Sequence, residues 1–151
     1  MKASPDGRHL ALAQRDSQCE LYDFDNATGG VSNYVRLALH DYTYGVEFSP
    51  NGRLLYGTCN GLGGGETQIW QFDLSKKDGA PVLVGKSKNR KIGAIQRGPN
   101  GRLYVAREDN ANLGVIEQPN EVGKACQYVD EGVKLGGRRS KLGLPGFITE
   151  P

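Results

Sequence analysis

One short phrase occurs three times in this chain of 151 residues. It reads SPDGRHLALA from Ser4, SPNGRLLYGT from Ser49 and GPNGRLYVAR from Gly98, so that successive copies begin 45 and 49 residues apart. In each copy a proline presets φ at one turn position, and the following Asp-Gly or Asn-Gly pair tolerates the positive φ of a sharp reversal. Alternating apolar residues flank the turn, which predicts a β-hairpin at every copy.

A second phrase keeps the same interval. ELYDFDNATGG from Glu20 matches QIWQFDLSKKDG from Gln68, which lies 48 residues later, and a weaker copy, LGVIEQPNEVG, begins at Leu113. A period in the forties with four strand signals in each period is typical of β-propeller blades. A helical solenoid has a similar period, but it needs apolar residues at 3.6-residue spacing, and the sequence shows no such spacing.

We therefore expect an all-β fold of about three four-stranded antiparallel blades that form part of a propeller. The blades should cover residues 4–39, 43–86 and 92–136, the first without its innermost strand, and an extra inner strand should lie at 142–149. This offset between the two ends is the one that propellers use to close their ring. Because rings typically need about 4–8 blades, we expect either a fragment of a larger propeller or an association of copies, for example two chains making six blades.

Composition and charge restrict the classes of protein and of partner that this chain can represent. No apolar stretch approaches the roughly 20 residues of a membrane-spanning helix, and a net charge of +2 demands no acidic partner. The chain begins inside the first hairpin motif without a secretory leader, so we expect its natural N-terminus to lie further upstream. The widely spaced Cys19, Cys59 and Cys126 do not suit a metal site, and we interpret them as small buried residues on strands.

Five ordered phrases resemble a known group of proteins. YGVEFSPNGRLLYGT, QIWQFDL, GAIQRGPNGRLYVA, LGVIEQPNEVGKACQY and LGLPGFI are similar to the C-terminal half of propeller regions in large secreted Bacteroidetes proteins associated with gliding motility and type IX secretion. In that group GLPGFI, more often with Asn in place of Gly146, marks the last strand of the propeller. The resemblance implies further blades upstream and a secreted or cell-surface location. It carries no catalytic residue over to this chain.

The candidate binding residues lie in loops that should share one face of the propeller. These loops join the fourth strand of a blade to the next blade, or the second strand of a blade to its third, and they hold the basic phrases KSKNRK and GRRSK. Such a face suits an anionic glycan or an acidic protein, and the alternative is a solvated loop surface without a ligand. The candidates are Arg15, His40, Asp41, Tyr42, Lys88, Arg90, Lys91, Arg107, Arg138 and Arg139.

Other motifs carry less weight. Aromatic residues are not interleaved with these basic residues, which argues against a nucleic-acid partner. GLGGGE lacks the Lys and the Ser or Thr of a phosphate-binding loop. REDNAN offers Glu108, Asp109 and Asn110 as oxygen ligands for Ca²⁺, but their spacing is not that of an EF-hand. We therefore predict no metal ion and no cofactor.

Three function classes stay open. We expect a non-enzymatic interaction or scaffold module of a secreted or cell-surface bacterial protein, because the loops offer surface rather than a catalytic set. The first alternative is a lactonase-like propeller enzyme, whose acids and metal ligands converge on the axis; here the axis-facing strands supply only Glu47. The second alternative is a carbohydrate-binding propeller, for which only Tyr42 is a suitable exposed aromatic. The expected partners are a protein, an anionic glycan, or further copies of the chain that complete the ring.

Overall fold

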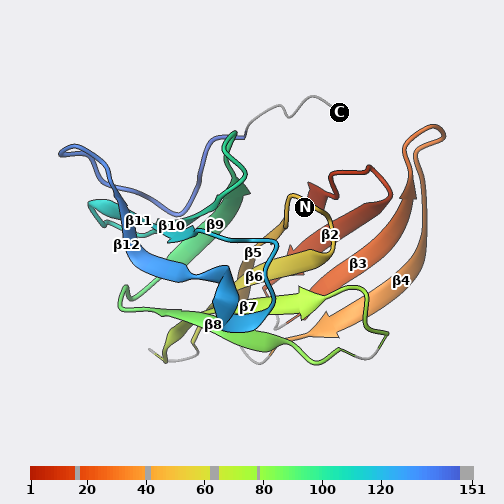
Figure 1. The fold of residues 1–151 in the computed structure, drawn as a ribbon, viewed down its shortest axis with the longest axis horizontal. Coiled ribbons are helices and arrows are strands. Elements are labelled where there is room, and N and C mark those ends of the chain that lie inside the picture. The colour runs from red at the N-terminus through yellow and green to blue at the C-terminus, as the bar shows by residue number, and fades with distance from the viewer. Residues whose placement is uncertain (16–17, 40–41, 62–64, 78, 147–151) are drawn as a thin grey trace.

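The computed structural model describes residues 1–15, 18–39, 42–61, 65–77 and 79–146. In these ranges the chain forms twelve strands in three four-stranded antiparallel sheets, together with one short 3₁₀ helix (Figure 1). The predicted all-β class and the four-stranded blades are confirmed. Among the described residues no helix is long and apolar enough to cross a membrane.

Each sheet is a meander in which strands that follow one another in the chain also pair in space. The first sheet consists of β1 (Lys2–Ala3), β2 (His9–Gln14), β3 (Gln18–Asp25) and β4 (Gly30–Ala38). The second consists of β5 (Tyr42–Phe48), β6 (Leu54–Asn60), β7 (Thr67–Asp73) and β8 (Val82–Ser87). The third consists of β9 (Ile92–Arg97), β10 (Leu103–Arg107), β11 (Asn112–Ile116) and β12 (Tyr128–Lys134), with the 3₁₀ helix η2 (Gly123–Cys126) before β12.

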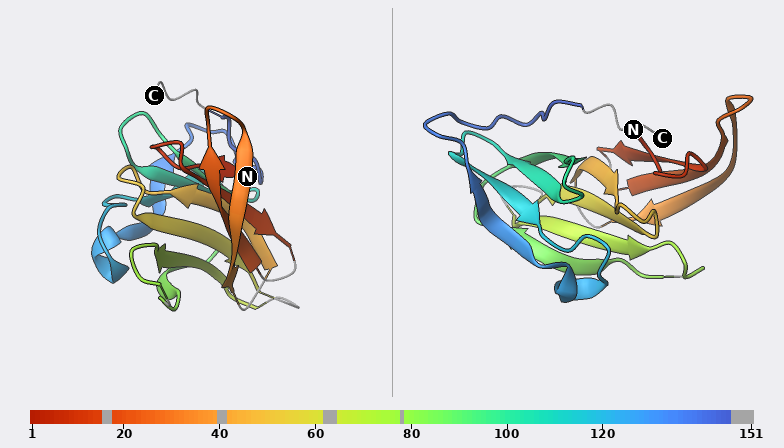
Figure 2. Two further views of the ribbon diagram at one scale, coloured as in Figure 1. Left: turned by 90° about the vertical axis from the view of Figure 1, so that its right-hand side faces the viewer. Right: turned by 45° about the horizontal axis from the view of Figure 1, so that its top comes forward.

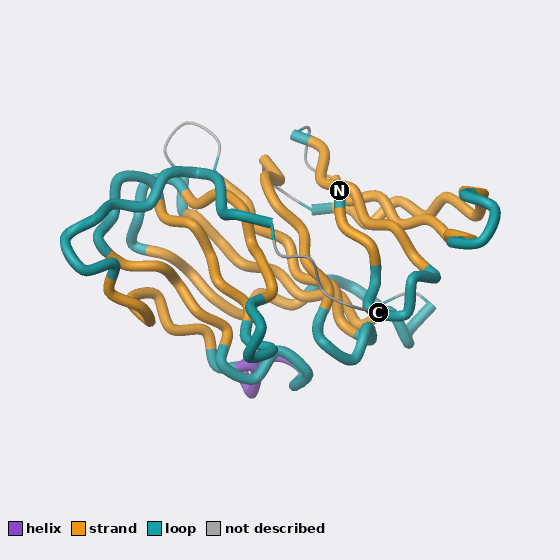
Figure 3. Tube along the Cα trace, turned by 90° about the horizontal axis from the view of Figure 1, so that it is seen from above, coloured by secondary structure: helices purple, strands orange, loops and turns teal. Residues whose placement is uncertain are grey.

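The three sheets follow one another face to face, as blades do (Figures 2 and 3). The innermost strands β5 and β9 lie next to each other, and β5 also contacts β2 of the first sheet. Side chains alternate between the two faces of each strand, so the second sheet fills two cores. Its Leu55 and Phe72 pack toward the first sheet, whereas Leu54, Tyr56 and Ile69 pack toward the third.

The three repeated turns, which the repeat predicts on one common face, lie close together at one end of the propeller. Pro5, Pro50 and Pro99 line one shallow hollow there. The turn glycines have positive φ, and the turns touch in sequence: a Cβ on Gly52 would lie 3.6 Å from Pro5 Cδ, and one on Gly101 would lie 3.7 Å from Pro50 Cγ. The turn of each blade therefore rests against the proline of the preceding blade.

Three expectations about strands need correction. The first sheet has an innermost strand after all, β1, although it pairs only with Leu10 and Ala11. Its outer strand was expected at about residues 34–39, but β4 begins at Gly30, since the chain reverses at Gly29. Cys126 is buried in η2 and not on a strand.

The predicted extra inner strand is not observed in its described part. Residues 142–146 form no strand, and residues 147–149 lie outside the described residues. Instead, the segment after β12 returns to β9, where the Ala94 amide donates to the Leu142 carbonyl at 2.7 Å (Figure 1). This is the single backbone hydrogen bond between β9 and the described residues 142–146, so no ladder forms.

Candidate functional site

A hollow of about 570 Å³ opens where β5 and β9 begin. The first two sheets contribute to it, together with the loop before β9 and the segment after β12, and it lies at the end of the propeller axis opposite the repeated turns. The residues that line it are Ala13, Arg15, Tyr42, Thr43, Tyr44, Asn60, Gly61, Arg90, Lys91 and Leu142. Asn60 fixes part of the wall, since its side chain donates to the Ile92 carbonyl and accepts from the Ile92 amide, both at 2.9 Å.

Cations and tyrosine rings dominate the polar lining of this hollow. The Arg15 guanidinium carbon lies 5.5 Å from the centre of the Tyr42 ring, a cation–π contact between the first and second sheets. Tyr44 is 46% exposed, so its ring is open to a ligand. The exposed Arg90 forms no ion pair with any described residue, and Lys91 has only a long ion pair with Glu108 at 3.8 Å. The hollow thus combines positive charge with aromatic surface.

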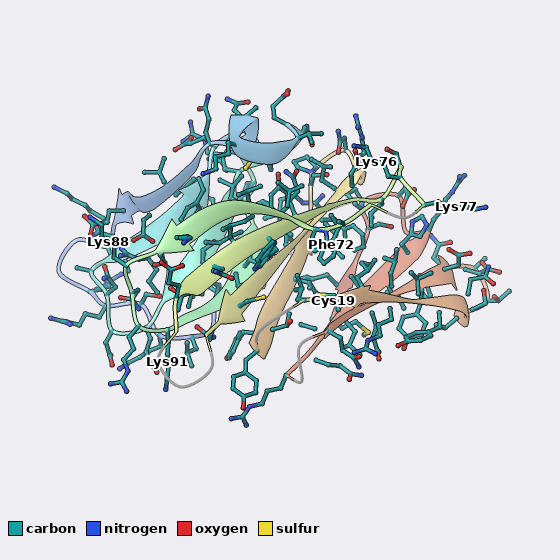
Figure 4. All side chains as sticks on the ribbon, turned by 90° about the horizontal axis from the view of Figure 1, so that it is seen from below. Cys19, Phe72, Lys76, Lys77, Lys88 and Lys91 are labelled. Atoms are coloured by element: carbon teal, nitrogen blue, oxygen red, sulfur yellow. The ribbon has the colours of Figure 1, made fainter. Side chains whose placement is uncertain are left out.

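The structure separates the predicted site residues into groups. Arg15, Tyr42, Arg90 and Lys91 meet in the hollow. Three others lie on the outer loops and do not line it: Lys88, Arg138 and Arg139. Figure 4 shows Lys88 and Lys91 at separate places on the left of the view, with Lys76 and Lys77 at the opposite end of the molecule. His40 and Asp41 lie outside the described residues.

Arg107 does not belong to an exposed binding face, and this expectation is corrected. The residue is only 1% exposed. Its guanidinium donates to Asn110 Oδ1 at 3.1 Å and to Asp130 Oδ2 at 3.0 Å, while its Nε has no hydrogen-bond partner among the described residues. A buried guanidinium requires a carboxylate partner, and Asp130 supplies it. Arg107 therefore joins β10 to β12.

Acidic residues neutralise part of the basic loop face. Lys86 pairs with Glu66 and Lys141 with Asp109, and each lysine lowers the pKa of the carboxyl that accepts its hydrogen bond. These pairs confirm that the two kinds of loop share one face. The oxygen ligands of REDNAN point to different partners, and the described residues contain no group of three or more potential metal ligands.

Glu47 lies on the axis, but it is buried and fully engaged. Its carboxylate is 3.0 Å from Lys2 Nζ and accepts hydrogen bonds from the amides of Phe48 at 3.0 Å and Arg97 at 3.1 Å. Lys2 also donates to the side chain of Gln96. One side chain from each innermost strand thus meets at the axis, and Glu47 joins strands there.

Sequence reasoning missed Lys2 and Gln96 as partners of Glu47, although a signal was present. Each of the three residues stands two positions before the first residue of a repeated turn phrase. Tyr44 and Asn60 were missed as well, because only folding brings the start of β5 to the end of β6. A comparison of equivalent positions in the three repeats would have found the axial residues.

No protein-family model matches the chain, and no curated protein matches it. Among solved structures, it is similar to a proposed 6-phosphogluconolactonase from Bacteroides fragilis, with a TM-score of 0.62 and 18% identity over 89% of this chain and 38% of the other. A proposed 6-phosphogluconolactonase from Bacteroides uniformis gives a TM-score of 0.57 and 19% identity over 89% and 40%. A luciferin-regenerating enzyme gives 0.52 and 20% over 70% and 35%.

The chain therefore spans about two fifths or less of the length of these structures. At such identities the likeness concerns the fold alone. It supports a partial β-propeller of the kind found in these proteins, which agrees with the three blades expected from the repeat. The likeness covers the blades and says nothing about the chemistry of the hollow.

Proposed function

We propose that the chain is a non-catalytic binding module whose axial hollow takes an anionic sugar: one that bears carboxylate, sulfate or phosphate groups. The observation that carries this proposal is the convergence of Arg15, Arg90 and Lys91 with two tyrosine rings in one hollow, from the first sheet, the second sheet and the loop that precedes the third. Guanidinium groups form strong charge-assisted hydrogen bonds with carboxylate and phosphate oxygens. Tyrosine rings supply apolar area together with a hydroxyl. A secreted or cell-surface location rests on the resemblance of the five sequence phrases.

The lining favours binding over catalysis. Among its described residues there is no carboxylate, imidazole or thiol to move a proton or attack a substrate. The nearest axial acid in sequence, Glu47, is held by Lys2 and by two backbone amides. The chemistry that the hollow offers is thus charge and ring surface.

Binding to a uronic-acid oligosaccharide, a sulfated oligosaccharide and a neutral oligosaccharide of similar length tests the proposal by calorimetry. We expect the two acidic sugars to bind and the neutral one to bind weakly or not at all. Arg90→Ala should weaken binding by about 10- to 100-fold, because a hydrogen bond to a charged group contributes about 1.5–3 kcal/mol. Added salt should also weaken it, since exposed charges are screened over about 10 Å at 0.1 M.

The matched control is Lys88→Ala, which removes one positive charge from the outer loops. It should leave the affinity nearly unchanged, because Lys88 does not line the hollow. If Lys88→Ala and Arg90→Ala weaken binding equally, or if binding survives both Arg15→Ala and Arg90→Ala, the hollow is not the site.

A lactone hydrolase is the second candidate, favoured by the likeness to the proposed 6-phosphogluconolactonases. A phosphorylated sugar lactone is anionic, so it would suit the same cations. The test follows the hydrolysis of such a lactone against its spontaneous rate. Hydrolysis above that rate that is lost in Arg90→Ala would replace the non-catalytic proposal, whereas binding of the acid without hydrolysis would support it.

A further inference from the structure

The contact between the second and third sheets defines what one blade presents to the next. Across the second sheet, the side chains in register are those of Glu47, Tyr56, Gln71 and Val82. The third sheet covers the middle of this row: Tyr56 is 0% exposed, and its hydroxyl donates to the Pro119 carbonyl at 2.8 Å. Gln71 donates to the Glu121 carbonyl and accepts from the Gly123 amide, both at 2.8 Å. We call the side of a sheet that bears this row its leading face.

The leading face of the third sheet has no blade on it among the described residues. Its equivalent row is Gln96, Tyr104, Val115 and Val129. Tyr104 stands where Tyr56 stands in the second sheet but is only partly buried, whereas Gln96 and Val115 of this row are buried. Val129 is as exposed as its equivalent Val82 in the second sheet. A largely apolar hollow of about 290 Å³ lies here, with Tyr104, Leu113, Leu144 and Pro145 in its wall. This face has the form of a blade interface without the neighbouring blade.

The opposite end of the molecule shows the complementary surface, which we call the trailing face of the first sheet. Alternation along β2 puts Leu10 and Leu12 on this face, because Ala11 between them belongs to the core with the second sheet. Leu10 is paired across the strands with Tyr22, and both are partly buried. The equivalent pair in the second sheet, Leu55 and Phe72, is 0% and 2% exposed.

Part of a following blade is already in place on the third sheet. The Ser140 carbonyl accepts from the Asp109 amide at 2.9 Å, and the Ser140 amide donates to the Asn110 carbonyl at 2.8 Å. Leu142 then lies against Gly93, just as β9 lies against Gly45. Residues 140–142 thus occupy the position from which the innermost strand of the next blade would run.

From these faces we propose that two copies of this chain associate head to tail, the leading face of each third sheet packing on the trailing face of the other first sheet. The contact continues the series of interfaces already present between the three blades. Two copies give six blades, within the range of about 4–8 in which propellers close, whereas three copies would give nine. Unlike faces that meet in a closing rotation form a ring rather than a filament. The inference does not depend on any ligand.

Sedimentation velocity over protein concentrations of about 1–100 µM tests the proposal. This range is suitable because interfaces of standard size have dissociation constants of about micromolar or lower. The chain of 16.4 kDa should sediment as a dimer at the upper end of this range. Leu10→Glu, on the trailing face, and Leu144→Glu, on the leading side, should each raise the dissociation constant about tenfold or more. A carboxylate placed in an apolar contact loses its hydration without gaining a partner.

Mixing the two variants makes the test specific. In a head-to-tail dimer, one interface of the mixed pair combines the two unaltered faces, so the mixture should associate more tightly than either variant alone. Val82→Glu is the matched control, because Val82 is already exposed on the outer strand of the second sheet, and it should dimerise like the parent chain. Far-ultraviolet circular dichroism of every variant checks that the blades remain folded.

Several outcomes overturn the proposal. A parent chain that stays monomeric throughout the concentration range excludes the interface. A dimer that tolerates either single substitution pairs like faces rather than unlike ones. Oligomers larger than the dimer exclude the six-bladed ring.

Discussion

At the scale of single residues, one aspartate organises the turn after the third strand in two of the blades. Asp73 accepts hydrogen bonds from Arg53 Nη2 at 2.8 Å and from the hydroxyl of Ser75 at 2.6 Å. Asp25 does the same for the Ala27 amide at 2.9 Å and the Thr28 hydroxyl at 2.7 Å. The aspartate of the repeated Phe-Asp pair in the sequence therefore stabilises the turn that follows the third strand.

We expect Asp73→Asn to lower the melting temperature at pH 7, and we expect this difference to shrink progressively as the pH falls below about 4. The hydrogen bond from Arg53, followed by that from Ser75, holds the pKa of the Asp73 carboxyl well below its usual value of 3.8. A depressed folded-state pKa contributes stability above the unfolded-state pKa, and the contribution is lost as pH falls through the folded-state pKa. Thermal melts of both proteins across this range give the difference directly. A loss as large at about pH 2 as at pH 7 would contradict the account, because the contribution declines between the unfolded-state and the folded-state pKa.

The destination of individual basic side chains could not be predicted from the sequence. Both Arg90 and Arg107 were expected in exposed polar loops, yet Arg90 lines a hollow and Arg107 is the buried last residue of β10. The pairing of β10 with β9 shifts register between Val105 and Arg107. Such an irregularity changes the direction in which a side chain points, and the local sequence gives no sign of it.

At the scale of strands, two glycines allow successive innermost strands to touch. A Cβ on Gly45 would lie 3.0 Å from the Ile95 nitrogen and 3.2 Å from the Gly93 carbonyl oxygen. A Cβ on Gly93 would lie 2.1 Å from the Leu142 carbonyl oxygen. All these neighbours are main-chain atoms, which have little room to move aside.

We expect Gly93→Ala to displace residues 140–142 from the third sheet. The added methyl group takes the space of the Leu142 carbonyl, so the bond from the Ala94 amide cannot form. Hydrogen–deuterium exchange should therefore speed up at Ala94. Gly143→Ala is the control, because a Cβ there would meet nothing within 4 Å. Unchanged protection at Ala94 in the Gly93 variant would count against this contact.

Most strands followed from the sequence because alternation and turn residues are local signals. β1 was missed because two residues show no alternation, and its pairing partner lies across the turn at Ser4. The strand at 142–149 was expected because an innermost strand should follow the fourth strand of the third blade. A strand requires repeated backbone pairing with a neighbour, and the described residues 142–146 form one backbone hydrogen bond to β9.

At the scale of the whole molecule, the second sheet links the three blades into one unit. One core, with Leu55 and Phe72, joins it to the first sheet; the other, with Tyr56 and Leu103, joins it to the third. Both cores use side chains of β6 from opposite faces. Loss of packing in either core should therefore lower the stability of all three blades together.

We expect Leu103→Ala to lower the free energy of unfolding by about 2–5 kcal/mol, the usual loss for a buried leucine. The transition should be single and should coincide when followed by circular dichroism and by the fluorescence of Trp70, which packs against the other core. Denaturation in urea measures both signals on one sample. If the Trp70 transition keeps its midpoint while the circular dichroism transition moves, the blades unfold separately.

The fold could be predicted from the sequence because the period and the turn phrase repeat along the chain. The candidate site could be predicted only in part. Arg15, Tyr42, Arg90 and Lys91 were named one by one from their loops, but the sequence does not tell which of ten candidates converge. Convergence depends on blade-to-blade packing, and packing is set by pairs such as Gly45 with β9 that lie far apart in the chain.

The proline and glycine of the repeated turn connect each blade to its neighbour. Gly52 meets Pro5 and Gly101 meets Pro50, so every link uses the same two residue types at the same two positions. A duplicated stretch of one period, inserted between two blades, would bring its own proline for the blade after it and its own glycine for the blade before it. At the turns, such a chain can gain or lose whole blades through gene duplication and deletion and keep the same proline–glycine contact.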